Sequence, residues 1–149
     1  MTTSFPISAI LQQKGRNIWS IDADATVFEA IKLMAHKNIG ALLVMSGEKL
    51  TGIFSERDYT RKIALLGRSS KQTKVKEIIS VPVISVTPNH SIDDCMRLMT
   101  EHRIRHLPVL DGEKVVGVIS IGDLVNWIIS TQNATIRQME EYISGGYLG

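Results

Sequence analysis

The pattern of apolar and polar positions in the first half of the chain predicts one helix, two strands and a second helix. From Thr26 onward the apolar residues follow the i, i+3, i+4, i+7 spacing of a helix with one buried face: Val27, Ala30, Ile31 and Met34. Thr26 and Glu29 have the spacing of a capping box at the start of this helix. The apolar runs 41–45 and 50–54 flank Ser46-Gly47, as in a short β-hairpin. A second helix is predicted from the residue after Ser55 to about Leu66.

The same pattern returns 65 positions later. Segment 21–63 aligns with segment 86–128 without a gap and is identical at 12 of 43 positions. The second copy predicts a helix capped by Ser91, a hairpin of runs 106–110 and 115–119, and a helix from Ser120 to about Ser130. Short β-rich runs at 18–21 and 83–86 open the two copies. The chain is therefore an internal repeat of the order β-α-β-β-α.

This element order predicts an α+β fold, of α/β type, in which two repeats pack face to face around a pseudo-twofold axis. A unit of about 60 residues with three strands is only marginally stable alone, so each copy needs the other to bury its apolar sheet face. Packing two similar units in this way leaves two equivalent clefts at the seam, which are common places for small ligands.

Composition narrows the class of protein. The 149 residues are 44% hydrophobic and 21% charged with a net charge of +2, which excludes disordered and collagen-like chains and demands no polyanionic partner. The single cysteine, Cys95, takes the place of Ala30 and is expected to be a small buried side chain. One cysteine fits a reducing compartment, the N-terminus does not resemble a signal peptide, and no apolar run approaches a membrane span. These features predict a cytoplasmic protein with no membrane association.

The repeats resemble a known family. Leu107-Pro108-Val109-Leu110-Asp111 and the stretch Gly117 to Asp123 are similar to a tandem pair of cystathionine β-synthase (CBS) domains, the Bateman module. Val75 to Ser80 is similar to the family's lead-in helix, and Ile7 to Leu11 is its counterpart, with three extra residues before the strand. The resemblance implies a first repeat at 6–68, a linker at 69–74, a second repeat at 75–131 and a C-terminal helix or tail at 133–149.

For function, the resemblance implies a non-enzymatic sensor with no catalytic cofactor. It would bind AMP, ADP, ATP, NAD or S-adenosylmethionine between the repeats and signal to an unidentified regulated protein. AMP or NAD is the expected ligand.

Two junctions between a strand and a helix carry the candidate ribose site. A carboxylate there is suited to accept hydrogen bonds from both hydroxyls of a ribose, and a serine hydroxyl beside it can assist. The candidates are Ser55, Asp58, Ser120 and Asp123. Ser-x-x-Asp is also a capping-box pattern that stabilises a helix start without any ligand, and the two roles do not exclude each other.

Phosphate groups need cations, and adenine needs apolar walls. Arg105 and His106 stand where related modules contact phosphates, whereas the first copy has Gly40 and Ala41, so the two clefts are expected to differ. Arg57 and Arg61, four residues apart, are the candidates in the first copy. The predicted adenine pocket is formed by Ile18, Ala41, Val83 and Leu107, and Trp19 is expected to face the core.

Two alternatives to nucleotide sensing remain open on the sequence. One is a ligand-free interaction scaffold, in which both Ser-x-x-Asp pairs are only helix caps. The other, less favoured, is nucleic-acid binding through segment 56–77, which has seven basic and three acidic residues. Most of its positive charge, from Arg68 to Lys76, has the composition of a solvated polar connector. The histidines are scattered, so no metal site is expected, and no catalytic constellation is present.

The tail adds one prediction about assembly. Ile136, Met139, Tyr142 and Ile143 have helical spacing in segment 133–149 and form an apolar stripe that needs a surface to cover. In the family that the sequence resembles, two such modules often associate as a dimer. Together with this resemblance, the apolar stripe predicts a homodimer.

Overall fold

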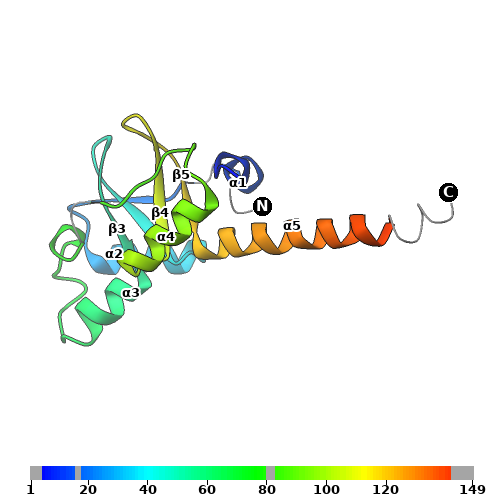
Figure 1. The fold of residues 1–149 in the computed structure, drawn as a ribbon. Coiled ribbons are helices and arrows are strands. Elements are labelled where there is room, and N and C mark those ends of the chain that lie inside the picture. The colour runs from blue at the N-terminus through cyan, green and yellow to red at the C-terminus, as the bar shows by residue number, and fades with distance from the viewer. Residues whose placement is uncertain (1–4, 16–17, 80–82, 142–149) are drawn as a thin grey trace. The chain divides into compact units, whose positions relative to one another are not determined.

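The computed structural model describes residues 5–15, 18–79 and 83–141 (Figure 1). The chain divides into two compact units. Unit 1 combines residues 1–16, 86–109 and 118–149, and unit 2 combines residues 17–85 and 110–117. The N-terminal segment therefore belongs to the same unit as most of the second repeat.

Unit 2 contains the elements of the first repeat that follow its lead-in segment, and the lead-in of the second. Its sheet has the order β1-β2-β3, with β1 (Ser20–Asp22) parallel to β2 (Ala41–Ser46) and β2 antiparallel to β3 (Lys49–Ser55). The helix α2 (Val27–Lys37) connects β1 to β2. After β3 come α3 (Glu56–Tyr59), a stretch of π-helical turns η2 (Thr60–Ala64) and a short 3-10 turn η3 (Val75–Glu77).

The start and the buried face of α2 are as predicted. Thr26 and Glu29 form the complete capping box, with the Glu29 N–H donating to Thr26 Oγ1 at 3.1 Å and the Thr26 N–H donating to Glu29 Oε2 at 3.1 Å. The helix ends at Asn38, whose left-handed backbone (φ 55°) closes the last turn. Its inward residues join a core of the following buried side chains: Ala23, Val27, Ala30, Met34, Leu42, Val44, Phe54, Ile63, Val75 and Ile78.

Unit 1 contains α1 (Ser8–Lys14), α4 (Ile92–His102) and α5 (Ile121–Glu141). It also contains the start of β4 (His106–Asp111) and the end of β5 (Lys114–Ser120), whereas residues 110–117 of this hairpin belong to unit 2. Its buried apolar residues are largely the repeat equivalents of the unit 2 core: Ile7, Ile10, Val86, Ile92, Cys95, Met99, Leu107, Val109, Ile119 and Leu124. Cys95 is fully buried, which confirms its role as a small core side chain. The repeat in sequence is therefore a repeat in structure, and the predicted α+β class is confirmed.

Several local predictions were wrong. The run 83–86 forms only one parallel bridge, between Val86 and Val109, where the first repeat has the three-residue strand β1. Trp19 does not face the core. It is 36% exposed, and the ammonium group of Lys37 lies 4.3 Å from its ring centroid. This cation–π interaction stabilises the Trp19 ring at the surface.

The last helix is longer than predicted. Instead of ending near Ser130, α5 continues without interruption to Glu141, so the described part of the tail is an extension of the second repeat's last helix (Figure 1). Among the described residues no helix, the 21-residue α5 included, is long and apolar enough to cross a membrane.

The glycine at position 52 gives a stability prediction. A Cβ added there would lie 2.7 Å from Cδ1 and 3.2 Å from Cβ of Ile79, so Ile79 would have to shift. We expect Gly52→Ala to lower the free energy of unfolding by about 1–2 kcal/mol because of this overpacking. The measurement is equilibrium denaturation of both the Gly52→Ala protein and the Gly52→Ala/Ile79→Ala double variant. Because Ile79→Ala removes the atoms that the added Cβ would contact, the double variant should lose less stability than the sum of the losses in the two single variants.

Gly122→Ala is the matched control, because the nearest atom to a Cβ at Gly122 is Ser120 Oγ at 3.6 Å, an ordinary contact. This variant should be as stable as the wild type or more stable. Additive effects of Gly52→Ala and Ile79→Ala would contradict the overpacking explanation.

Candidate functional site

The first Ser-x-x-Asp pair lies where β3 ends and α3 begins. The Ser55 N–H donates to Asp58 Oδ2 at 2.9 Å, the Ser55 hydroxyl donates to the same oxygen at 3.0 Å, and the Asp58 N–H donates to Ser55 Oγ at 3.2 Å. This is a complete capping box. Both side chains are half-buried, so the carboxylate is held in one place at the surface of unit 2.

The second pair repeats this geometry in unit 1. The Ser120 N–H donates to Asp123 Oδ2 at 2.8 Å, and the Asp123 N–H donates to Ser120 Oγ at 3.1 Å. Both pairs are therefore helix caps, as the alternative interpretation of the sequence predicted. A cap uses only part of a carboxylate's hydrogen-bonding capacity, so capping a helix does not exclude binding a ribose. The role of these pairs in ribose binding stays a prediction.

A third Ser-x-x-Asp box shows that the motif alone does not define a site. Ser91 and Asp94 cap α4 with the same two bonds, at 3.0 Å each. The hydrogen bonds from the Ser91 backbone and side chain lower the pKa of Asp94 below its usual value. Asp94 also has a cation beside it, with Arg97 Nη1 at 3.8 Å from its Oδ1. What distinguishes the two junction carboxylates from Asp94 is therefore their position directly after a strand.

Each junction carboxylate pairs with a lysine, but the lysines come from different elements. Lys62, one turn after Asp58, places Nζ 3.4 Å from Asp58 Oδ1 and donates to the carbonyl of Ile78 at 2.7 Å. Asp123 pairs with Lys14, from the end of α1. Lys14 Nζ lies 2.7 Å from Asp123 Oδ2 and donates to the carbonyl of Val118 at 2.8 Å.

The pKa of Asp123 reflects this environment. Burial of the carboxyl group opposes ionisation, but the hydrogen bonds from Lys14 and Ser120 and the charge of Lys14 outweigh it. The net result is a pKa below the usual value, so Asp123 is a carboxylate at neutral pH.

A backbone hydrogen bond places each junction beside the start of another strand. The Glu56 N–H donates to the carbonyl of Gly40 at 3.1 Å, and the Ile121 N–H donates to the carbonyl of Arg105 at 2.9 Å. In unit 2 this bond and the pairing of Ala41 with Ser55 bring Ala41 close to the ribose candidates. In unit 1 the equivalent bond brings Arg105 and the neighbouring His106 close to Ser120 and Asp123.

The other predicted residues are more scattered. Arg57 is half-buried at the start of α3, and Arg61 is exposed within the π-helical turns. Arg105 is exposed, whereas His106 is half-buried at the first position of β4. Their roles as phosphate ligands stay predictions.

The predicted adenine residues Ile18, Ala41 and Val83 are half-buried. Leu107 is fully buried and offers no accessible surface in this structure. Ile18 and Val83 were predicted to open the first strands of their repeats, but they precede the β-structure, which begins at Ser20 in one repeat and at Val86 in the other. The adenine pocket stays a prediction.

The basic segment 56–77 is partly neutralised by its own unit. At least four of its seven cations pair with carboxylates: Lys62 with Asp58, Arg68 with Glu77, and both Lys74 and Lys76 with Asp24. Its backbone also binds α2, because the Val27 N–H donates to the carbonyl of Thr73 at 2.8 Å. The segment therefore packs against the first repeat as more than a solvated connector.

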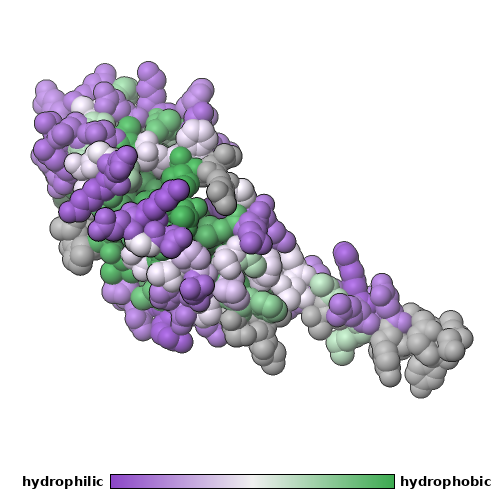
Figure 2. Space-filling view, turned by 90° about the horizontal axis from the view of Figure 1, so that it is seen from above, coloured by the Kyte–Doolittle hydropathy of each residue, from purple (hydrophilic) through white to green (hydrophobic). Residues whose placement is uncertain are grey.

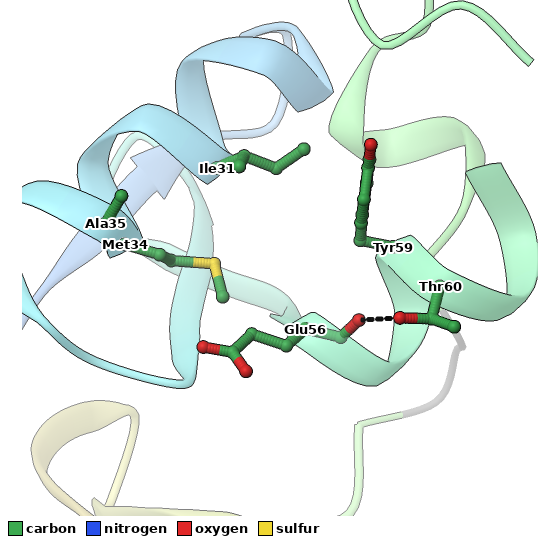
Figure 3. A pocket seen from close by; sticks show the side chains of 6 residues that line it. All are labelled: Ile31, Met34, Ala35, Glu56, Tyr59 and Thr60. Atoms are coloured by element: carbon green, nitrogen blue, oxygen red, sulfur yellow. Dashed lines mark hydrogen bonds between the residues drawn. The ribbon is translucent and has the colours of Figure 1, made fainter. Parts of the chain in front are cut away.

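One pocket in unit 2 was not predicted. It has a volume of about 310 Å³ and lies between α2 and α3, lined by Ile31, Met34, Ala35, Glu56, Tyr59 and Thr60 (Figure 3). These residues include none of the predicted ribose, phosphate or adenine residues. The charged residue among them is a carboxylate, so the pocket does not suit a phosphate. The amphipathic pattern of α2 indicated a buried face at Ile31 and Met34 but not the gap beside Tyr59.

Two other kinds of chemistry find little support. In the part of the chain that the structure describes, no three His, Cys, Asp or Glu side chains gather as metal ligands would. Burial raises the pKa of the Cys95 thiol to about 11, which disfavours the reactive thiolate.

The fold and the junctions define the class of protein, and comparison with known families agrees. The profile of the CBS domain matches residues 14–65 and 75–130. The chain belongs to the CBS domain family, with two CBS domains in tandem.

Individual relatives support this assignment. The mitochondrial CBS domain-containing protein CBSX3 of Arabidopsis thaliana is 41% identical over 97% of this chain and 74% of its own length. Among solved structures, a protein with CBS domains from Burkholderia ambifaria MC40-6 is 53% identical, with a TM-score of 0.82 over 86% of this chain and 96% of that one. A hexameric CBS-CP12 protein from bloom-forming cyanobacteria is 31% identical, with a TM-score of 0.72 over 81% of this chain and 69% of that one.

The lowered pKa of Asp123 predicts a pH-dependent contribution to stability. A carboxyl group whose pKa is lower in the folded state stabilises the fold above its unfolded pKa, and this contribution is lost as the pH falls through the folded value. We expect Asp123→Asn to cost about 1 kcal/mol at neutral pH, as for loss of a helix cap. The difference from the wild type should shrink as the pH falls below the ordinary value of 3.8. Denaturation at a series of pH values measures it, and a difference independent of pH would contradict the role of the charge.

Proposed function

We propose that this CBS-domain protein is a non-enzymatic regulatory module that binds an adenine nucleotide, AMP, ADP, ATP or NAD, in the clefts between its two repeats. The observation that carries the proposal is the repeated junction geometry. In both repeats a half-buried aspartate is fixed by a serine cap, and a backbone hydrogen bond holds the junction beside the start of a strand. Membership of the CBS family supports an adenine ligand for such an arrangement.

The residues divide by chemistry. Asp58 and Asp123 accept hydrogen bonds from ribose hydroxyls, assisted by Ser55 and Ser120. Arg57 and Arg61 in the first repeat, and Arg105 and His106 in the second, contact phosphates. Ile18, Ala41, Val83 and Leu107 enclose the adenine. Leu107 reaches a ligand only if the residues covering it in this structure shift.

Regulation requires that the nucleotide favours one arrangement of the repeats over another, because a ligand shifts an equilibrium only through its differential affinity. A partner protein reads the change. The Burkholderia relative carries a name that links it to signal transduction, which supports such a role. We place the protein in the cytoplasm because its one cysteine is a buried free thiol, although the Arabidopsis relative is mitochondrial.

The alternatives make different predictions. The scaffold hypothesis is supported by the caps, which account for both Ser-x-x-Asp pairs without a ligand. The nucleic-acid hypothesis is weakened by the four carboxylate-paired cations of segment 56–77.

Calorimetry with AMP, ATP and NAD distinguishes the nucleotide sensor from the scaffold. We expect the wild type to bind at least one of them and the Asp58→Ala/Asp123→Ala variant to lose at least tenfold in affinity, as when charged hydrogen bonds worth about 1.5–3 kcal/mol are removed. Asp94→Ala is the matched control, because Asp94 caps a helix through the same motif but is not a ribose candidate. It should lower the melting temperature and leave binding unchanged. Absence of binding by the wild type, or equal loss in the Asp94→Ala control, would contradict the proposal.

We also propose that the protein forms a homodimer through α5. Val125, Ile129, Ile136 and Met139 are 42%, 50%, 52% and 60% exposed, and their positions fit a repeat of 3.5 residues, the spacing of a helix that packs along another helix. Every described side chain from Gln132 to Glu141 is exposed, and green apolar residues lie among purple polar ones on this part of the surface (Figure 2). A second copy offers a helix with the same repeat. Self-association also occurs in the hexameric cyanobacterial relative.

Ile136→Asp tests this dimer. A charge in the stripe should shift the protein towards the monomer by at least tenfold in dissociation constant, because a carboxylate would be buried against apolar residues. Light scattering over a range of concentrations measures the shift. Ala134→Asp is the control, since Ala134 is also exposed but lies outside the stripe. A wild-type monomer, or equal effects of both substitutions, would contradict dimerisation through α5.

A further inference from the structure

The two lead-in segments are equivalent at their start but differ in length. The Ile7 N–H donates to the carbonyl of His90 at 2.9 Å, and the Val75 N–H donates to the carbonyl of Ala25 at 2.9 Å. Since His90 and Ala25 are themselves repeat equivalents, these bonds align Ile7 with Val75. The η3 turn ends at Glu77, whereas α1 continues to Lys14. The longer helix of the N-terminal segment therefore has an additional turn.

This additional turn delivers a lysine to the second junction. Lys14 is the last residue of α1, and the N–H of Gly15 closes the helix on the carbonyl of Leu11 at 3.2 Å. Lys14 Nζ then donates to both Asp123 Oδ2, at 2.7 Å, and the carbonyl of Val118, at 2.8 Å. Two acceptors at hydrogen-bond distance fix the ammonium group at the carboxylate. The Lys14 and Asp123 side chains are 37% and 21% exposed, so the pair can open without disrupting the core.

The first repeat holds its lysine in a different way. Its lysine, Lys62, belongs to the turns that follow α3, lies 3.4 Å from Oδ1 of Asp58 and makes its shorter bond to the carbonyl of Ile78. In the second repeat the position of Lys62 is taken by Trp127. The charge beside Asp123 is therefore supplied by α1, an element outside the repeat that it neutralises.

The bonds at Asp123 limit what a ligand can use. Oδ2 accepts from the Ser120 N–H and from Lys14, which occupies both of its lone pairs. At Asp58 the second donor to Oδ2 is the hydroxyl of Ser55, which can rotate away without breaking an ion pair. Oδ1 keeps its lone pairs, so a ribose must displace a donor at Asp123 when its two hydroxyls take one carboxylate oxygen each. Of the two donors on Oδ2, the Lys14 side chain can move and the Ser120 backbone N–H cannot. At Asp58 the same approach displaces no ammonium from Oδ2.

We propose that Lys14 is an internal competitor for the second nucleotide site: it holds Asp123 until a ribose displaces it, and its displacement frees the end of α1. This inference rests on the proposed function, because it concerns the same carboxylate. It makes the two sites unequal in affinity, and it couples occupancy of the second site to the N-terminal helix.

The test isolates the second site and compares adenosine, which has no phosphate, with AMP. Adenosine and AMP are titrated by calorimetry into Asp58→Ala and into Asp58→Ala/Lys14→Met. Methionine keeps most of the length of the lysine side chain but removes the charge. If Lys14 competes with the ribose, Lys14→Met should tighten adenosine binding about 3- to 10-fold, the range that an exposed ion pair with an added hydrogen bond accounts for. Lys62→Met in the same background is the control and should leave the second site unchanged.

The outcomes separate the two proposals. If adenosine binds Asp58→Ala at least as tightly as it binds Asp58→Ala/Lys14→Met, Lys14 does not compete with the ribose. This result would overturn the role of Lys14 and leave the proposal of nucleotide binding intact. A failure of the wild type and all variants to bind adenosine or AMP would overturn the proposed function and this inference with it. The melting temperature without ligand provides a check on folding: Lys14→Met should lower it only slightly, as expected for loss of one exposed ion pair.

Discussion

The hydrogen-bonded serine–aspartate pair at the end of each hairpin is the constraint on which the rest of the site depends. The first turn of a helix has N–H groups without partners, and here the serine hydroxyl and the aspartate carboxylate satisfy two of them reciprocally. The pair decides where the chain stops being a strand and becomes a helix. It therefore also decides where a half-buried carboxylate stands, and the backbone bond from Glu56 or Ile121 fixes the neighbouring strand relative to it.

A group that stabilises the fold can also bind a ligand when its capacity exceeds what the fold uses. A carboxylate accepts about four hydrogen bonds, and the cap of Asp123 uses one of them. Asp94 has the same unused capacity, but its helix α4 follows a loop, not a strand, and no phosphate candidate precedes it. The context of the cap, and not the capping motif, is therefore the physical basis for assigning Asp58 and Asp123 to a ligand.

Local patterns made most of the fold predictable, and long-range contacts account for what was missed. The spacing of Val27, Ala30 and Met34, and the capping pattern at Thr26, depend on neighbours within one or two turns, so the sequence contained them directly. The contact between Lys14 and Asp123 joins residues 109 positions apart. Its signal was the three-residue excess before the first strand, but only the structure shows that these residues extend a helix. Trp19 was misjudged because its repeat equivalent is the aliphatic Ile84. The long side chain of Lys37, which covers the Trp19 ring, also has no lysine at the equivalent position, where the second repeat has His102.

The two copies keep the same core but differ in what surrounds their junctions. The core positions exchange one apolar residue for another, because each repeat must bury the same sheet face. At the junctions the copies differ in the source of the neutralising charge, Lys62 from the repeat's own turns in one and Lys14 from α1 in the other. If a ligand binds both carboxylates, equal intrinsic contacts still give unequal affinities, since the cost of releasing the lysine differs. Only a ligand at Asp123 then releases Lys14 and with it the end of α1. The two sites of a duplicated fold can therefore differ in their effect on the protein although both use the same kind of carboxylate.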